Sequence, residues 1–263
     1  KKLLALSLVA AMAVGVFAGC SSSEEPAETT EGTEEGAEAT GEKYIIATDT
    51  VFPPFEFTNE DGDFVGIDVD IINAIAEDQG IDVEIQSLGF DAALLAVQSG
   101  QADGVIAGMS ITDERKQSFD FSEPYFDADV TMAVAKGSDV KSYEDLAGKT
   151  VAVKTATNGA DFAKSIADEY GFTVVEFKDS PTMYQDVIAG NTAACFEDYP
   201  VMAYNIQQGA ELEMPEGATA AGTQYGFAVA KGQNAELLEK FNTGLANIKE
   251  NGKFQEIVDT YTK

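Results

Sequence analysis

Histidine is absent from this chain of 263 residues, which limits the chemistry that its side chains can do. Serine–histidine–aspartate and cysteine–histidine catalysis are excluded, and so are metal sites built from histidine. The adjacent carboxylates Glu197 and Asp198 could act as an acid–base pair, but paired carboxylates are equally what an ammonium group requires. Arg115 carries a planar guanidinium that can give two parallel hydrogen bonds to a carboxylate. These residues favour recognition of charge over catalysis, and we expect no cofactor and no metal.

Arg115 and Asp198 also have purely structural explanations. Arg115 could pair with carboxylates on the surface of a helix begun by Thr112. Asp198 could cap the helix that begins near Pro200, because an aspartate two residues before a proline suits a helix start. The local sequence leaves both explanations open.

Short apolar strands alternate with helical patterns from residue 43 onward, which is typical of an α/β domain with mainly parallel sheets. Strands are predicted at residues 44–47, 81–85, 149–153 and 174–175. Apolar helical faces are predicted at Ile71, Ile72, Ile75 and Ala76, and again along residues 162–170, each ending at the next glycine, Gly80 or Gly171.

Two stretches of the chain resemble each other at a fixed spacing. Residues 75–83 match residues 166–174, and Gly100 then corresponds to Gly190. This internal similarity predicts two lobes of like construction with a cleft between them. Small ligands usually bind in such clefts, near the carboxyl ends of strands.

The end of the sequence predicts that the chain crosses back to its first lobe. Residues 226–230 read as a strand, and an amphipathic helix follows with Leu237, Leu238, Phe241, Leu245 and Ile248 on one face. We expect a first lobe of residues 43–125 and 226–263, a second lobe of residues 130–220, and a hinge of residues 125–129 and 221–225.

The amino terminus predicts export and attachment to a membrane. Residues 1–20 carry two lysines, an apolar run and then Cys20, which is typical of a lipoprotein signal peptide cut before a lipidated cysteine. A signal peptide or an uncleaved anchor with an accidental cysteine is the alternative. Residues 21–42 hold eight glutamates and no base, so we expect a disordered acidic linker.

The formal net charge of −30 would repel a phosphate backbone, so no nucleic-acid partner is expected. Cys195 is the only cysteine besides Cys20, so no disulfide within the folded part is expected. We expect a monomer.

Four motifs carry a resemblance to a known family. They are residues 47–57 (ATDTVFPPFEF), 65–70 (VGIDVD), 107–115 (AGMSITDER) and 120–125 (DFSEPY). Across residues 43–263 the chain resembles the polar amino-acid solute-binding proteins of ABC importers, particularly the glutamine-binding type, in periplasmic-binding-protein-like family 3. The resemblance implies a type II fold of two α/β lobes, each a mixed and mostly parallel sheet flanked by helices, joined by a two-strand hinge.

The resemblance also assigns roles around an amino-acid ligand. It implies that Arg115 holds the α-carboxylate with backbone N–H groups of Ser110 and Asn158. It implies that Asp198, the Ser110 hydroxyl and the Gly108 carbonyl hold the α-ammonium. Phe52 and Phe90 match aromatic residues that sandwich the ligand's side chain, although each phenylalanine taken alone reads as a core residue.

The tip of the ligand's side chain is read, by the same resemblance, by Asp49, Lys154 and Glu197, with Thr157 and Asn158 lining the adjacent turn. Lys154 disfavours a cationic ligand and the two carboxylates disfavour an acidic one, so a neutral amide is favoured and glutamine leads. Glutamine-type members usually carry histidine where Glu197 stands, which leaves arginine or another basic amino acid open. An alternative is that Lys154 and Glu197 pair with each other across the closed cleft.

The expected function is capture of a polar amino acid by an extracytoplasmic lipoprotein, which passes it to the membrane permease of an ABC importer. A receptor-associated sensor is the main alternative, because it would use the same binding chemistry. An enzyme of the same fold, such as a dehydratase, is disfavoured by the missing histidines.

Overall fold

The computed structural model describes residues 43–263, except for the side chain of Ala221. The predicted signal peptide, the lipidated Cys20 and the acidic linker lie outside the described residues. Within residues 43–263, no helix has both the length and the apolar character needed to span a membrane. Cys195 is a buried free thiol within this part of the chain.

The first lobe is built on a sheet of five strands in the order β4–β1–β5–β13–β6. Strands β4 and β5 pair in parallel with β1, whereas β13 is antiparallel to its neighbours. The strands are β1 (Lys43–Thr48), β4 (Asp82–Ser87), β5 (Gly104–Val105), β6 (Phe119–Phe121) and β13 (Ala228–Ala230), with a separate hairpin of β2 (Phe57–Thr58) and β3 (Phe64–Val65). The helices of this lobe are α1 (Ile67–Gln79), α2 (Phe90–Gln98), the short 3₁₀ helix η1 (Arg115–Gln117), α6 (Ala235–Glu250) and α7 (Lys253–Thr262).

The second lobe is built on a sheet in the order β11–β7–β10–β8–β9, with β12 also paired to β7. Strands β10, β8 and β9 are parallel to one another, and β7 is antiparallel to β10. The strands are β7 (Phe126–Ala135), β8 (Thr150–Lys154), β9 (Thr173–Phe177), β10 (Ala194–Asp198), β11 (Leu212–Glu213) and β12 (Thr219–Tyr225). The helices are the 3₁₀ helix η2 (Glu144–Leu146), α3 (Asn158–Tyr170), α4 (Ser180–Ile188) and α5 (Tyr199–Gln207).

The predicted internal similarity is real in three dimensions. Helices α1 and α3 each have 13 residues and end at a glycine in the left-handed conformation, Gly80 with φ 62° and Gly171 with φ 70°. In each lobe the strand after this helix pairs in parallel with the strand before it, as β4 does with β1 and β9 with β8. The first lobe differs because the β2–β3 hairpin is inserted before α1.

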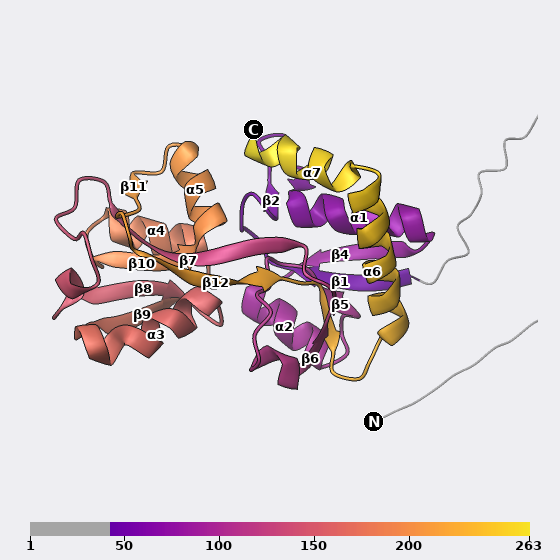
Figure 1. The fold of residues 1–263 in the computed structure, drawn as a ribbon, viewed down its shortest axis with the longest axis horizontal. Coiled ribbons are helices and arrows are strands. Elements are labelled where there is room, and N and C mark those ends of the chain that lie inside the picture. Colours follow the sequence, from indigo (N-terminus) through magenta and orange to yellow (C-terminus); the bar gives the residue numbers. More distant parts are fainter. Residues whose placement is uncertain (1–42) are drawn as a thin grey trace, which may run out of the picture. The chain divides into compact units, whose positions relative to one another are not determined.

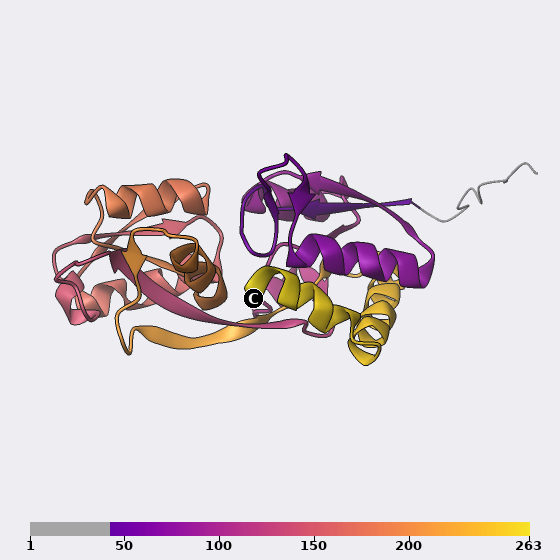
Figure 2. The same cartoon turned by 90° about the horizontal axis from the view of Figure 1, so that it is seen from above.

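The final helices return to the first lobe, as the sequence predicts. Helix α6 packs against α1 and buries Leu237, Phe241, Leu245 and Ile248. The ring of Phe241 stacks on that of Phe227 with centroids 4.5 Å apart. Such a ring pair stabilises the fold by about 0.5–1.5 kcal/mol beyond the contribution of the buried apolar area. Figures 1 and 2 both show the yellow α6 and α7 beside the purple α1.

Strands β7 and β12 carry the chain between the two lobes. They pair antiparallel, with Tyr225 opposite Phe126, and the pairing is interrupted by an irregularity between Ala220 and Thr223. Figure 2 shows the two strands running together from one lobe to the other. The division into residues 43–125 with 226–263 against 130–220 stays a prediction, because it concerns which parts move as units.

Candidate functional site

A small cavity lies between the lobes, and most of the predicted site residues line it. Its lining residues are Phe52, Phe90, Ala107, Gly108, Ser110, Arg115, Lys154, Thr157, Asn158 and Asp198. Of the predicted residues, Asp49 and Glu197 are outside this lining. The cavity volume is about 10 Å³, close to the smallest that holds a single water. An amino acid can therefore enter only if the lobes separate or side chains move.

Arg115, the only arginine of the chain, is directed into the cavity. Its backbone N–H, at the first residue of the short helix η1, donates to the hydroxyl of Thr112 at 3.2 Å. The guanidinium donates through Nη1 to the carbonyl of Ser110 and through Nη2 to the carbonyl of Ala156, each at 2.8 Å. Because Ala156 belongs to the second lobe, Arg115 bridges the lobes instead of pairing with the acidic residues of its own turn.

The loop that receives Arg115 leads into α3. Ala156 has a positive φ of 63°, which turns the backbone after β8. Thr157 caps α3 by accepting a hydrogen bond from the N–H of Ala160 at 3.2 Å, and Asn158 is the first residue of the helix. Thr157 and Asn158 both line the cavity, and the start of a helix is a place that favours an anion.

Asp198 stands at the end of β10, where α5 begins. It occupies the N-cap position of α5, as the structural explanation expects, but its side chain makes no capping hydrogen bond. It accepts instead a hydrogen bond of 2.5 Å from the hydroxyl of Tyr225, at the end of β12. Burial, and then the nearby Glu197, raise the pKa of Asp198 to about 7. A cation that enters the cavity would stabilise the charged form of Asp198 and lower its pKa.

Lys154 and Asp49 form a buried ion pair across the lobes, each side chain 2% exposed. The ammonium of Lys154 also lies 4.2 Å from the ring centroid of Phe52 and 5.5 Å from that of Phe90. Burial alone would lower the pKa of Lys154, but the carboxylates of Asp49 and Glu197 outweigh it and the pKa is raised. The two phenylalanines therefore face a cation supplied by the chain itself.

Glu197 is turned into the second lobe. Its Oε2 accepts hydrogen bonds from the hydroxyls of Ser180 at 2.7 Å and Tyr184 at 2.9 Å, both on α4. A pairing of Glu197 with Lys154 across the cleft is wrong, because both residues belong to the sheet of the second lobe and Lys154 pairs with Asp49. Asp49, the actual partner, comes from the first lobe.

The peptide of Gly108 is held by residues that the sequence analysis did not single out. Asp68, fully buried on α1, accepts through Oδ2 from the N–H of Gly108 at 2.7 Å and from the hydroxyl of Tyr125 at 2.8 Å. Gly108 has a φ of 53°, and a Cβ there would come within 2.7 Å of the ring of Phe52. A polar residue in the apolar face of a predicted helix was the available signal for Asp68.

Residues 44–263 match the family described as bacterial extracellular solute-binding proteins, family 3. The chain is a member of this family. The family 3 solute-binding protein described here is 31% identical to the arginine-binding extracellular protein ArtP of Bacillus subtilis (strain 168), over 96% of this chain and 94% of ArtP. The resemblance inferred from the motifs is therefore confirmed at the level of the family.

Solved structures support the predicted two-lobed fold of this solute-binding protein. Substrate-binding domain 2 of Lactococcus lactis GlnP, in an open conformation, is 46% identical over 85% of this chain and 96% of its own, with a TM-score of 0.60. An ancestral arginine-binding protein bound to arginine is 38% identical over 84% of this chain and 98% of its own, with a TM-score of 0.78.

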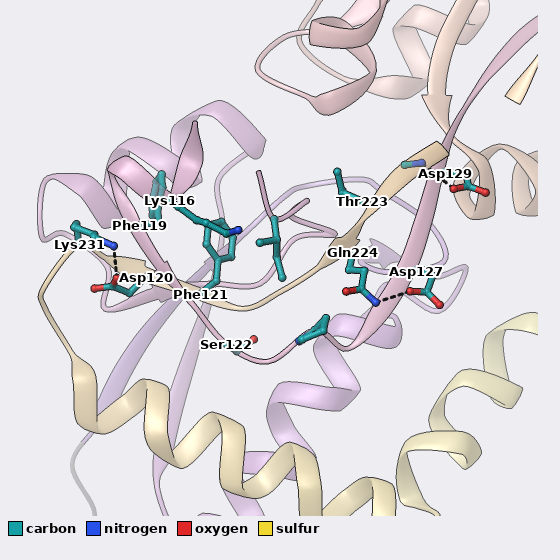
Figure 3. A pocket seen from close by; sticks show the side chains of 13 residues that line it. Lys116, Phe119, Asp120, Phe121, Ser122, Asp127, Asp129, Thr223, Gln224 and Lys231 are labelled. Carbon is teal, nitrogen blue, oxygen red and sulfur yellow. Dashed lines mark hydrogen bonds and ion pairs between the residues drawn. The ribbon is translucent and has the colours of Figure 1, made fainter. Parts of the chain in front are cut away.

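A larger hollow of about 1050 Å³ lies beside the strands that join the lobes of this solute-binding protein (Figure 3). Three aspartates line it, and each already has a partner. Asp120 pairs with Lys231, Asp127 accepts from the amide of Gln224, and Asp129 accepts from the N–H of Gly222. Each carboxylate that lines this hollow therefore already has an ion-pair or hydrogen-bond partner within the chain.

Proposed function

We propose that this chain binds a polar amino acid, with glutamine as the preferred ligand, in the cavity between its lobes. The bound amino acid is delivered to the membrane permease of an ABC importer. The protein works as a monomer, without catalysing a reaction, and uses closure of its lobes to hold the ligand.

One observation carries this proposal: Arg115 of the first lobe and Asp198 of the second face the same cavity. A free amino acid carries a carboxylate and an ammonium, and burying either without a partner is costly. Arg115 already makes two hydrogen bonds to carbonyl oxygens, which a ligand carboxylate would replace with stronger, charge-assisted bonds. Burial and Glu197 disfavour the charged form of Asp198, and an incoming ammonium would stabilise that form.

The groups near Phe52 and Phe90 support a neutral side chain on the ligand. A cationic side chain between these rings would place a second positive charge beside the ammonium of Lys154. An acidic side chain would approach the carboxylate of Asp49, which pairs with Lys154. An amide can accept a hydrogen bond from the ammonium of Lys154 and donate one to a carboxylate. The side chain of glutamine is therefore compatible with both the positive and the negative group. Arginine is the second candidate, because ArtP is named as an arginine-binding protein.

The comparison of TM-scores supports closure as the mechanism. The protein bound to arginine superposes better than the GlnP domain in its open conformation, although the GlnP domain is more similar in sequence. The lobes described here therefore lie nearer to the arrangement of a ligand-bound relative. Shifting a hinge from 1:99 to 99:1 closed requires about 10⁴-fold tighter binding to the closed form, which bonds made to both lobes supply.

Titration calorimetry with glutamine tests the proposal. Arg115→Ala removes the carboxylate partner, and we expect glutamine affinity to fall by at least about 100-fold, since a hydrogen bond to a charged group contributes about 1.5–3 kcal/mol and two are lost. Lys116→Ala is the matched control, because this exposed neighbour pairs with Asp113 on the surface. Equal affinity of Arg115→Ala and wild type would contradict the assigned site.

Thermal unfolding in the presence of each of the twenty amino acids tests the choice of ligand. An amino acid at 100 times its dissociation constant should stabilise the fold by about 2.7 kcal/mol. We expect the largest increase in Tm with glutamine. A larger increase with arginine would replace glutamine by the second candidate and leave the binding site itself in place.

We also propose that Cys20 is lipidated and tethers the folded part to the outer face of the cell membrane. Cys20→Ala in the full precursor is expected to release the protein from the membrane fraction into the medium or periplasm. Membrane attachment unchanged by this substitution would contradict the lipid anchor.

A further inference from the structure

Tyr225 joins the strand that links the lobes directly to the predicted ammonium site. It is the last residue of β12, and its side chain is fully buried. Its side chain packs in the core of the first lobe, and its hydroxyl donates to Oδ2 of Asp198 of the second lobe at 2.5 Å. Its backbone bridges to Ser110, and its carbonyl accepts from the N–H of Tyr125 at 2.9 Å.

Packing alone does not explain why this residue is a tyrosine. The ring lies edge-on to Phe55 with centroids 5.1 Å apart and stacks on Phe126 at 6.2 Å, contacts that a phenylalanine would make equally well. The hydroxyl adds one interaction, the bond to Asp198. Burial, and then Asp198, raise the pKa of Tyr225 well above its usual value, so the hydroxyl keeps its proton and remains a donor.

The bond leaves Asp198 oriented for a ligand. With Oδ2 held by Tyr225, the carboxylate still lines the cavity, and Oδ1 is available to an ammonium. Ser110, whose backbone forms an isolated antiparallel bridge with Tyr225, also lines the cavity.

We propose that Tyr225 is a positioning residue, which sets the orientation and the charge of Asp198 for the ligand's α-ammonium and does so only when the lobes lie together. This inference rests on the proposed function, because it assumes that Asp198 receives an ammonium. It goes further, because it assigns a role in ligand binding to Tyr225, which was predicted only to be part of the hinge.

The charges around Asp198 define what the hydroxyl does. Burial, and then Glu197 on the same strand, oppose ionisation of Asp198, whereas Tyr225 on β12, Arg115 on η1 and Lys154 on β8 favour it. Among the described residues, Tyr225 is the one of these three groups that donates a hydrogen bond to the carboxylate of Asp198. Removing the hydroxyl therefore raises the pKa of Asp198 further and leaves the carboxyl protonated, without a charge for the ammonium, up to higher pH.

The test measures the affinity for L-glutamine from pH 5 to pH 8.5 in Tyr225→Phe and wild type, or for L-arginine if the amino-acid screen selects it. We expect the midpoint of the acid-side loss of affinity to rise by about one pH unit in Tyr225→Phe, so that binding at pH 6 weakens about tenfold relative to wild type. At pH 8.5 the two proteins should agree within about threefold, because Asp198 is then ionised in both.

Tyr143→Phe is the matched control, since its hydroxyl donates to the carbonyl of Ala218 in the second lobe and does not touch Asp198. We expect its midpoint to equal that of wild type. Replacement of Tyr225 by 3-fluorotyrosine keeps the fold and makes the hydroxyl a stronger donor, so the midpoint should move in the opposite direction, to lower pH.

A midpoint that is the same in Tyr225→Phe, the fluorinated protein and wild type would overturn the inference. If Tyr225→Phe fails to fold, the fluorinated protein decides the question by itself. Failure of the proposed function gives a different result, because wild type would then show no amino-acid binding that depends on Arg115.

Discussion

At the scale of single residues, the proposed ammonium site at the buried Asp198 predicts that ligand binding is linked to the release of a proton. Its pKa is raised to about 7, so below that pH most of the carboxyl is protonated. A ligand ammonium favours the charged form, and binding must then release a proton. We expect proton release and weaker binding at pH 6, and neither at pH 8. Calorimetry in buffers of different ionisation enthalpy measures the release, and an equal value at both pH values would contradict the assignment.

Asp68 is expected to weaken the fold at neutral pH. Burial raises its pKa from 3.8 to about 7, and its Oδ1 has no hydrogen-bond partner among the described residues. The folded state then binds more protons than the unfolded state between about pH 4 and pH 7, so the stability from this group is present at low pH and is lost as pH rises through 7.

Asp68→Asn keeps an acceptor for Gly108 and Tyr125 but removes the charge. We expect the free energy of unfolding at pH 8 to rise by on the order of a few kcal/mol, with a smaller change between pH 4 and pH 7. Asp70→Asn is the control, because this half-buried carboxylate of α1 accepts instead from the hydroxyl of Tyr261 on α7. Urea unfolding of Asp68→Asn that shows a loss of stability at pH 8 would contradict this prediction.

The sequence was sufficient to place the charged residues of one cavity but not their partners. Arg115 and Asp198 could be predicted because their chemistry and motifs point to a zwitterion. The hydrogen bonds that the hydroxyls of Ser180 and Tyr184 donate to Glu197 were not predicted, because no local pattern encodes a hydrogen bond between distant residues. Tyr225 was missed for the same reason, whereas Asp68 had a local signal, a polar residue within an apolar helical face.

At the scale of elements, the periodic segments were the most predictable. Helices α1 and α3 follow from apolar faces that end at a glycine, and both patterns are local. The strand predicted at residues 226–230 is shorter in the structure, where β13 covers Ala228–Ala230. The irregular pairing of β7 and β12 depends on how two distant segments meet, which a single sequence does not encode in its periodicity.

Gly222 lies at that irregularity and is predicted to tolerate no side chain. A Cβ there would stand 1.8 Å from the carbonyl oxygen of Ala128 and 2.4 Å from the Cα of Asp129, both backbone atoms. We expect Gly222→Ala to destabilise the protein by about 1–3 kcal/mol, the usual cost of overpacking, and to weaken glutamine binding by displacing the strands that join the lobes. Thr223→Ala, which adds no atom beside Gly222, is the control, and an unchanged Tm for Gly222→Ala would show that the strands are not crowded.

At the scale of the whole described region, residues of both lobes make the contacts that hold the lobes together. Lys154 pairs with Asp49, Arg115 reaches the carbonyl of Ala156, and Val201 of α5 is buried in the core of the first lobe. Separation of the lobes returns the charged groups to water, so these contacts act on the balance between open and closed forms more than on the stability of each lobe.

The ion pair is the sharpest test of this balance. Lys154→Met leaves Asp49 buried without a partner in the closed form, at a cost of about 3–5 kcal/mol, whereas the open form hydrates it at no such cost. We therefore expect Lys154→Met to increase the radius of gyration measured by small-angle X-ray scattering. Asp49→Asn added to Lys154→Met removes the orphaned charge and should restore the smaller radius. Lys164→Met, which breaks an exposed pair with Glu176, is the control and should change little. A double variant as extended as Lys154→Met alone would mean that the lysine acts through its packing on Phe52, and that the charge of Asp49 has no part in closure.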